Sequence, residues 1–274
     1  MIRTKGSLLF ALIAGGCAGI APCAELKPVT AVAWQEYLRS SEAGQQARLS
    51  DANTFLWIDD VAGRKEKVRR GDIVVAPVVG DGTQNVQNGL IHHWIGAVFI
   101  PNVTLNALLA VIDDYDSYKT VYKPVVVDSQ SLRSDATGHE FSMVWVRHAL
   151  FVHAAMRARY QAREFVVDPH RRYSVVDATC IQQIENYGSP AERLLPPDTG
   201  SGFLWRIHST SRYEQNDGGV YLEVEVIALS RDIPPSVRWV AVPVVNHLSI
   251  ASLKTTLHQT RQAVQVQEMR ASTN

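Results

Sequence analysis

The sequence has 274 residues with 27 basic and 27 acidic side chains, so its formal net charge is zero and no net positive field attracts a nucleic acid. Hydrophobic residues make up 46% and charged residues 20%, which is typical of a globular protein and excludes a disordered one. The three cysteines, Cys17, Cys23 and Cys180, form no CxxC pair and no cluster at zinc spacing, which excludes a disulfide scaffold and a zinc module.

Residues 1–24 have the pattern of an export signal. Two basic residues precede an apolar run over residues 8–14, which is too short for a membrane-spanning helix, and small residues follow it. Cleavage after Ala24 is the simplest expectation. The stretch AGGC at residues 14–17 also resembles a lipobox, so a lipid on Cys17 is the weaker alternative. Either route predicts an exported protein, periplasmic or secreted, which is lipid-anchored only if Cys17 is modified.

Residues 25–71 are expected to form an N-terminal extension that packs on one main domain of residues 72–268, with a tail at 269–274. Helical periodicity over residues 28–50 places four apolar or aromatic side chains on one side: Val32, Trp34, Tyr37 and Leu38. The charged stretch over residues 55–71 is expected to be a solvated loop, and residues 80–89 are rich in turn formers.

The order of elements in the main domain predicts an α+β fold. Strands at 72–79 and 90–100 precede a helical stretch that Asn102 would cap and that continues through the aromatic residues 115–122. Six further strands are expected at 125–132, 140–151, 155–168, 172–185, 203–214 and 219–232. The sequence Asn-Asp-Gly-Gly at 216–219 favours a tight hairpin turn. Helical periodicity then predicts a long helix over 244–264.

A curved antiparallel sheet closed by one long helix leaves a gap in which apolar ligands bind. Residues 98–122, 203–234 and 244–264 carry a pattern that resembles the helix-grip fold of the START-like (SRPBCC, Bet v 1-like) superfamily, over residues 85–265. That superfamily includes lipid-transfer domains, polyketide cyclases and aromatases, and plant ligand-binding allergens. The resemblance implies about seven strands wrapped on the C-terminal helix and a cavity for a hydrophobic small molecule or lipid. It carries over no catalytic residue.

Charged side chains follow strand parity in the last strands. Glu223 and Glu225 share one face, and Arg206 and His208 lie on one face of the preceding strand, whereas the apolar Leu222 lies on the other face. One interpretation is a salt-bridged, solvent-facing convex side, which the usual apolar-in, polar-out pattern favours. The alternative places Glu225 and Arg206 on the cavity floor, where they would orient a polar ligand head or act as acid and base.

Seven aromatic residues are candidates for the wall of a ligand cavity or for a plain core: Trp94, Tyr115, Tyr118, Trp145, Tyr160, Trp205 and Trp239. Parity predicts that Trp145, Tyr160 and Trp205 face the terminal helix. The candidate ligand-binding residues are therefore Trp94, Tyr118, Trp145, Tyr160, Trp205, Arg206 and Glu225.

No metal or cofactor is expected. His92 and His93 are neighbours on a strand and point to opposite faces, and the chain contains no GxSxG, P-loop or GxGxxG motif. Cys180 has no partner arrangement typical of a nucleophile and is expected to be a buried small hydrophobe.

Three hypotheses for the function remain open. The first is non-catalytic binding or transport of a hydrophobic small molecule or lipid, with membrane contact only through a lipidated Cys17 or during ligand exchange. The second is a cyclase- or dehydratase-type enzyme with Glu225, Arg206 or Tyr160 as acid-base group. The third is an interaction module in which an N-terminal helix at 30–48 fills or covers the cavity.

Overall fold

The computed structural model describes residues 24–49, 54–149 and 152–271. The elements in chain order are β1 Ala24–Glu25, α1 Pro28–Leu49, η1 Trp57–Asp60, α2 Arg64–Arg69, β2 Val74–Pro77, β3 Thr83–Val86, β4 Gly89–Pro101, α3 Leu105–Ile112, η2 Tyr115–Ser117, α4 Tyr118–Val121, β5 Val126–Asp135, β6 Gly138–Ala149, β7 Val152–Asp168, β8 Arg171–Glu185, β9 Arg193–Leu194, β10 Thr199–Gly200, β11 Arg206–Asn216, β12 Gly219–Arg231 and α5 Pro235–Ala271.

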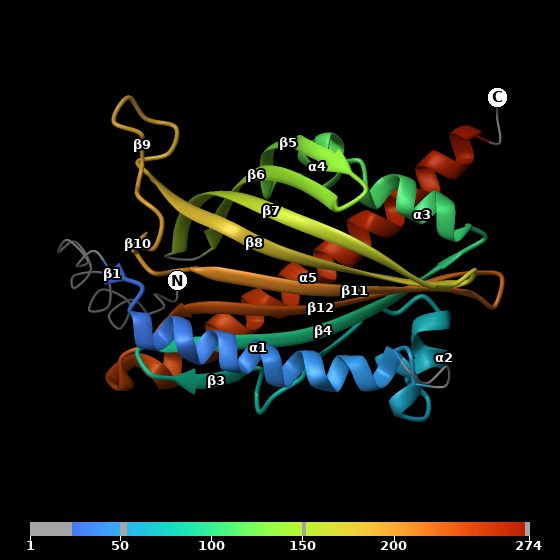
Figure 1. The fold of residues 1–274 in the computed structure, drawn as a ribbon, viewed down its shortest axis with the longest axis horizontal. Coiled ribbons are helices and arrows are strands. Elements are labelled where there is room, and N and C mark those ends of the chain that lie inside the picture. Colours follow the sequence, from blue (N-terminus) through green and yellow to red (C-terminus); the bar gives the residue numbers. More distant parts are fainter. Residues whose placement is uncertain (1–23, 50–53, 150–151, 272–274) are drawn as a thin grey trace, which may run out of the picture.

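A ten-stranded antiparallel sheet dominates the molecule, and α5 crosses behind it while α1 runs along its front (Figure 1). The strand order is β2-β4-β12-β11-β8-β7-β6-β5, with β3 also on β4 and β9 also on β8. The expected α+β helix-grip fold is confirmed, but the expected count of about seven strands is wrong. The additional short strands include β3, which lies within the turn-rich segment at 80–89, and β9. A separate two-stranded sheet joins β1 to β10.

The face of the sheet that α5 covers is called the inner face. On β4 and β12 it carries the alternating residues Val98, Ile100 and Leu222, which form one core cluster with the buried α5 residues Leu253 and Leu257. Gly96 of β4 lies directly against α5, because a Cβ atom at this position would meet the side chains of Leu253 and Leu257 at 3.0–3.1 Å. This contact ties the second half of α5 to the sheet. The helix begins nine residues before the expected 244 and contains Pro243.

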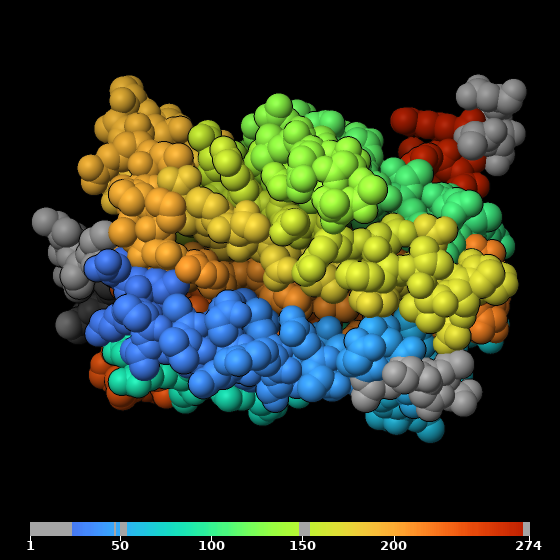
Figure 2. Space-filling view, viewed as in Figure 1, coloured from blue at the N-terminus to red at the C-terminus, as the bar shows by residue number. Residues whose placement is uncertain are grey.

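The opposite, outer face is covered over its lower half by α1 (Figure 2). Trp34 and Leu38 of α1 pack on Ile227 and Leu229 of β12. Next to them, a second cluster joins the segment at 54–69 to the ends of β4 and β12, with four fully buried side chains: Phe55, Leu56, Ile58 and Val68. The charged stretch at 55–71 is therefore not a solvated loop as expected. Lys67, Arg69 and Arg70 are exposed and Arg64 and Lys65 are partly buried, while the apolar residues pack on the outer face.

Local signals set two of the chain reversals. In the turn between β11 and β12, Asp217 and Gly218 both have positive φ, at 54° and 77°, as the hairpin prediction required. The helix after β4 starts later than expected, because Thr104, and not Asn102, accepts a hydrogen bond from the Ala107 amide. Among the residues described, no helix combines the length and apolar character of a membrane span.

Candidate functional site

Along β11 and the middle of β12, solvent reaches the inner face more than the outer face. Along β11, the inner residues Ile207, Ser209 and Ser211 are partly exposed, whereas the alternating outer residues from His208 to Arg212 are buried. The same alternation continues on β12, where Val224 and Val226 are partly exposed and face α5. Apolar side chains in the middle of a sheet are therefore accessible although a helix lies over them.

Small and aromatic side chains shape the continuation of this inner face on β6, β7 and β8. Four buried alanines contribute little volume: Ala154, Ala158, Ala162 and Ala178. Beside them the Phe141 ring stacks on Tyr160 at 4.9 Å and on Tyr115 at 4.1 Å between centroids. Met143 and Trp145 are only partly buried at the edge of this cluster. The inner face of these strands is thus lined by aromatic rings on one side and by alanines on the other.

The first half of α5 covers this wall without sealing it. Residues 235–252 include no buried side chain, whereas the second half of the helix buries Leu253, Leu257, Thr260 and Val264. Arg147 of β6 reaches across and donates a hydrogen bond from its guanidinium to the Ser252 hydroxyl, at 2.6 Å. Burial lowers the pKa of Arg147, which nevertheless remains a cation at neutral pH. It is a candidate partner for the polar end of a ligand.

The structure brings three of the predicted ligand-binding residues together. Tyr118, Trp145 and Tyr160 belong to one cluster on the inner face. Burial raises the pKa of Tyr160 to about 12, so its hydroxyl stays protonated. Tyr118 donates its hydroxyl to the Ile112 carbonyl oxygen at 2.5 Å. Trp94 also lies on the inner face but packs in the neighbouring cluster with α3 and α5. Their role in binding stays a prediction.

The other three lie on the outer side of the sheet. Trp205 packs with Trp34 and Leu38 of α1, so the expectation that it faces the terminal helix is wrong. It precedes the first residue of β11, where strand parity does not yet apply. Arg206 forms an ion pair with Asp198 at 2.5 Å. Glu225 lies beneath α1. Trp239, from the wider aromatic set, is 79% exposed.

A buried polar network occupies the interface between α1 and the sheet. The Arg212 guanidinium, with no exposed side-chain surface, bridges Glu223 at 2.8 Å and Glu225 at 3.0 Å. His93 also contacts Glu225, at 2.8 Å, and its other ring nitrogen lies 2.7 Å from the Tyr37 hydroxyl of α1. The second Glu223 oxygen accepts a hydrogen bond from the Trp57 amide at 2.7 Å.

The cavity-floor interpretation of this polar ladder is wrong, because its members face away from α5. The other interpretation is right about the face and the salt bridges, but it is wrong about solvent on β12, where Glu223 is 0% exposed. The physical reason is the N-terminal segment, because α1 and residues 54–69 cover the outer face. The signal that could have revealed the cover is the set of apolar residues between the charges of that segment, such as Phe55 and Ile58.

The two carboxylates of the network have opposite pKa shifts. Burial raises the pKa of Glu223 from 4.5 to about 7, against the opposing effect of Arg212. Burial also acts to raise the pKa of Glu225, but its hydrogen bond to His93 and the charge of Arg212 outweigh burial and lower it to about 2. One guanidinium shared by two buried carboxylates accounts for this split, because it cannot fully neutralise both.

The shift at Glu223 predicts a pH-dependent stability. The unfolded chain releases this proton near pH 4.5 and the folded chain near pH 7, so the contribution of Glu223 to stability falls as pH rises between these values. Between pH 4.5 and 7.5, we expect the free energy of unfolding to fall by about 3 kcal/mol in the wild type relative to Glu223→Gln. Urea unfolding at several pH values measures this difference.

The matched control is Glu185→Gln, which changes a carboxylate that pairs with Arg193 on the surface. Its stability is expected to stay within about 1 kcal/mol of the wild type at every pH. A wild-type minus Glu223→Gln difference that does not change with pH would contradict the raised pKa.

The third hypothesis required an N-terminal helix in the cavity. In the structure α1 lies on the outer face, with its Trp34 and Leu38 against β12, and it neither fills nor covers the inner face. The part of the interaction-module hypothesis that placed the N-terminal helix in or over the cavity is therefore wrong.

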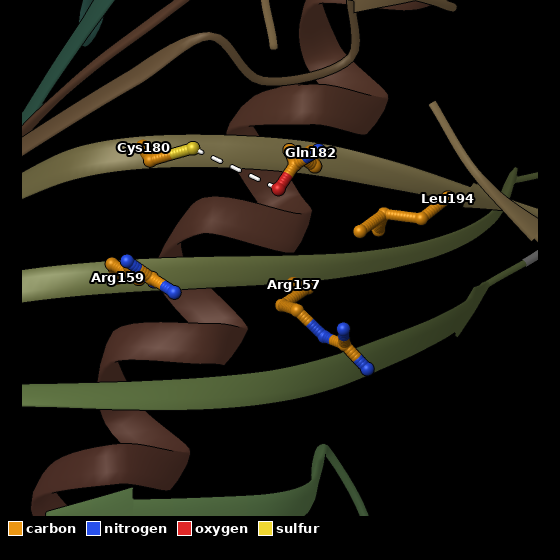
Figure 3. A pocket seen from close by; sticks show the side chains of 5 residues that line it. All are labelled: Arg157, Arg159, Cys180, Gln182 and Leu194. Carbon is orange, nitrogen blue, oxygen red and sulfur yellow. Dashed lines mark hydrogen bonds between the residues drawn. The ribbon is translucent and has the colours of Figure 1, made fainter. Parts of the chain in front are cut away.

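Cys180 also differs from the expectation. It is partly exposed and not buried, and it lines a hollow of about 370 Å³ with Arg157, Arg159, Gln182 and Leu194 (Figure 3). A second hollow of similar volume lies where the end of α2 meets α5.

Within the described residues, no three His, Cys, Asp or Glu side chains gather as metal ligands. His92 contacts the Ser230 hydroxyl at 2.9 Å, and burial lowers its pKa to about 4.

No family model matches the sequence, and no curated protein matches it. Solved structures are similar in fold at low identity. A STAR-related lipid transfer protein (fragment 25–204) from Xanthomonas axonopodis has 14% identity and a TM-score of 0.44, over 68% of this chain and 99% of that chain. Human STARD10 has 7% identity and a TM-score of 0.42, over 72% and 80%. The Zhui aromatase/cyclase from Streptomyces sp. R1128 has 12% identity and a TM-score of 0.39, over 64% and 96%.

Proposed function

We propose that the protein binds a hydrophobic small molecule or lipid on the inner face of the sheet, beneath the first half of α5, without changing it chemically. The observation that carries this proposal is the partial exposure of apolar inner-face residues, above all Ile207, Val224 and Val226, where the outer residues of the same strands are buried. An exposed apolar surface gains free energy when a ligand covers it.

Affinity would come mainly from apolar contact. Each 100 Å² of apolar surface removed from water contributes about 2.5 kcal/mol. The Arg147 guanidinium and the hydroxyls of Ser209 and Ser211 lie at the same face and would orient a polar end of the ligand. Such a ligand has a large apolar part and few polar groups, as lipids and fused aromatic rings do.

Catalysis has less support than binding. Of the three acid-base candidates, Arg206 and Glu225 lie on the outer side of the sheet. Arg206 forms an ion pair with Asp198, and Glu225 contacts His93 and Arg212. Tyr160 is on the inner face, but a pKa of about 12 makes its hydroxyl a hydrogen-bond donor and a poor base near neutral pH. Of the three predicted candidates, only this phenol lies on the inner face.

Export is part of the proposal. Residues 1–23, with the expected signal and Cys17, lie outside the described residues. Cleavage after Ala24 would leave Glu25 as the first residue, and Glu25 pairs with Thr199 in the small β1-β10 sheet. The mass of the mature chain, measured on exported protein, distinguishes this cleavage from lipidation at Cys17.

The direct test is mass spectrometry of the organic extract of the mature protein, purified without detergent. We expect one apolar species or one lipid class at close to one molecule per chain. Re-addition of that species to delipidated protein should raise the melting temperature. An empty extract, together with no thermal shift across a panel of lipids and aromatic polyketides, would contradict the proposed function.

A further inference from the structure

Arg157 and Arg159 line a hollow on the outer face of the sheet, together with Cys180, Gln182 and Leu194 (Figure 3). On this face α1 does not cover β7 and β8 (Figure 2). Arg157 and Arg159 lie two residues apart on β7, so their side chains leave the strand on the same side. Figure 3 shows α5 behind these strands, which places the hollow on the face opposite the proposed ligand site. Leu194 of β9 forms another part of its wall.

Neither arginine has a charged neighbour across the sheet. Arg157 lies opposite Val144 of β6 and Gln182 of β8, and Arg159 lies opposite Ser142 and Cys180. These are the four positions at which a carboxylate would pair directly with them, and all four are uncharged. Within the described part of the chain, neither guanidinium has an ion-pair partner within 4 Å.

Several other arginines of the same sheet are paired with carboxylates. Arg163, further along the same face of β7, contacts Asp177 at 3.7 Å. Arg172 of β8 contacts Glu164 at 2.7 Å, and Arg206 of β11 contacts Asp198. Arg157 and Arg159 are exposed and differ from these three in having no such partner. Two like charges two residues apart on one strand face repel each other, and an anion bound between them would reduce that repulsion, so the pair indicates a place for a ligand charge.

The surroundings of the two guanidinium groups are apolar. Val144, Val146, Ala155 and Ile184 form a small buried cluster on the same face of β6, β7 and β8. Leu194 is 40% exposed at the wall of the hollow. A ligand that contacts both the guanidinium groups and Leu194 would have one anionic group with an apolar part next to it.

We propose that this outer hollow binds an amphipathic anion, in which a carboxylate or a phosphate ester lies between Arg157 and Arg159 and an apolar chain or ring contacts Leu194. Guanidinium groups pair with both kinds of oxyanion through two parallel N–H donors. The site is separate from the inner face, and its existence does not depend on the proposed function.

Cys180 provides a local probe, because its thiol lines the same hollow. The experiment measures the rate at which neutral iodoacetamide alkylates the peptide that carries Cys180, by mass spectrometry of the full chain after digestion. Decanoate and decyl phosphate are added as anionic ligands, decanol as the uncharged ligand, and inorganic phosphate as the charge alone. We expect decanoate or decyl phosphate to slow alkylation at least fivefold and decanol to have little effect.

The variant Arg157→Gln/Arg159→Gln should lose this protection, and Arg163→Gln, which removes a paired arginine from the same strand face, should keep it. Protection by only one of the two anions supports the site and names its charge. Equal protection by decanol, protection that persists in the double variant, or no protection would overturn the proposal. Isothermal titration calorimetry with the same ligands gives a second readout that does not depend on thiol reactivity, and binding confined to the inner face would leave Cys180 unprotected.

Discussion

Replacement of Arg212 by methionine is expected to lower the free energy of unfolding by about 3–5 kcal/mol, because it removes one partner of a buried ion pair and leaves charge behind. Arg212 is 0% exposed, and its two terminal nitrogens bond Glu223 and Glu225, which have exposures of 0% and 6%. Without the guanidinium, two carboxylates remain between α1 and the sheet. His93 contacts only Glu225, and Arg48 of α1 acts on both through its charge without a hydrogen bond to either. Such a loss is a large share of the stability of a typical domain.

Urea unfolding at pH 7 measures this effect. Arg163→Met is the matched control, because it breaks a half-exposed pair with Asp177 and should cost less than about 1 kcal/mol. The triple variant Arg212→Met/Glu223→Gln/Glu225→Gln should regain part of the loss, since it no longer buries unpaired charge. A cost below about 1 kcal/mol for Arg212→Met alone would show that water reaches the network in solution.

Strand parity sorted the side chains of the last strand correctly. Leu222 and Val224 do face α5, and Glu223 and Glu225 do share the opposite face, because alternation follows from backbone geometry alone. Parity cannot say what covers each face. Charged residues in a strand usually mean a solvent-facing side, and here the same pattern belongs to an interface with α1.

The N-terminal segment was difficult to predict for a related reason. Its charges are concentrated in residues 64–70, and the apolar residues among and before them have no regular spacing that would mark a buried helix face. The buried face of α2 consists of one residue, Val68, and Phe55 lies between α1 and η1, outside any helix. Their burial depends on the position of β4 and β12, which is a tertiary property.

The candidate site was predicted in outline and not in detail. The order of strands and the terminal helix predicted a ligand site between them. Trp145 and Tyr160 lie on the inner face, and their role in binding stays a prediction. Ile207, Val226 and Arg147 were not singled out, because single aliphatic residues or a lone arginine on a strand look like ordinary core or surface positions. Their place in the proposed site depends on which part of α5 is buried against the sheet. That part begins at Leu253, which packs on Gly96.

Introduction of a carboxylate on the inner face is expected to abolish hydrophobic binding without unfolding the protein. In Val226→Glu, the new side chain lies at a partly exposed position between Trp94 of β4 and Ser209 of β11, so water can solvate it in the free protein. A ligand that covers this position must remove that water. We expect the affinity to fall at least about 100-fold, which corresponds to about 2.7 kcal/mol.

The measurement is displacement of a fluorescent fatty acid or polyaromatic probe from delipidated protein, with thermal unfolding as the check on the fold. Val166→Glu is the matched control, since Val166 lies near the end of β7 and is already 66% exposed, and its affinity should be unchanged. Val226 lies on the inner face of the sheet, and Arg157 and Arg159 lie on the outer face. Val226→Glu and Arg157→Gln/Arg159→Gln therefore test the two sites separately. Loss of probe binding in Val226→Glu with Cys180 protection intact supports the inner face as the hydrophobic site. Unchanged probe affinity in a folded Val226→Glu protein would remove the inner face as that site, whatever the outer hollow binds.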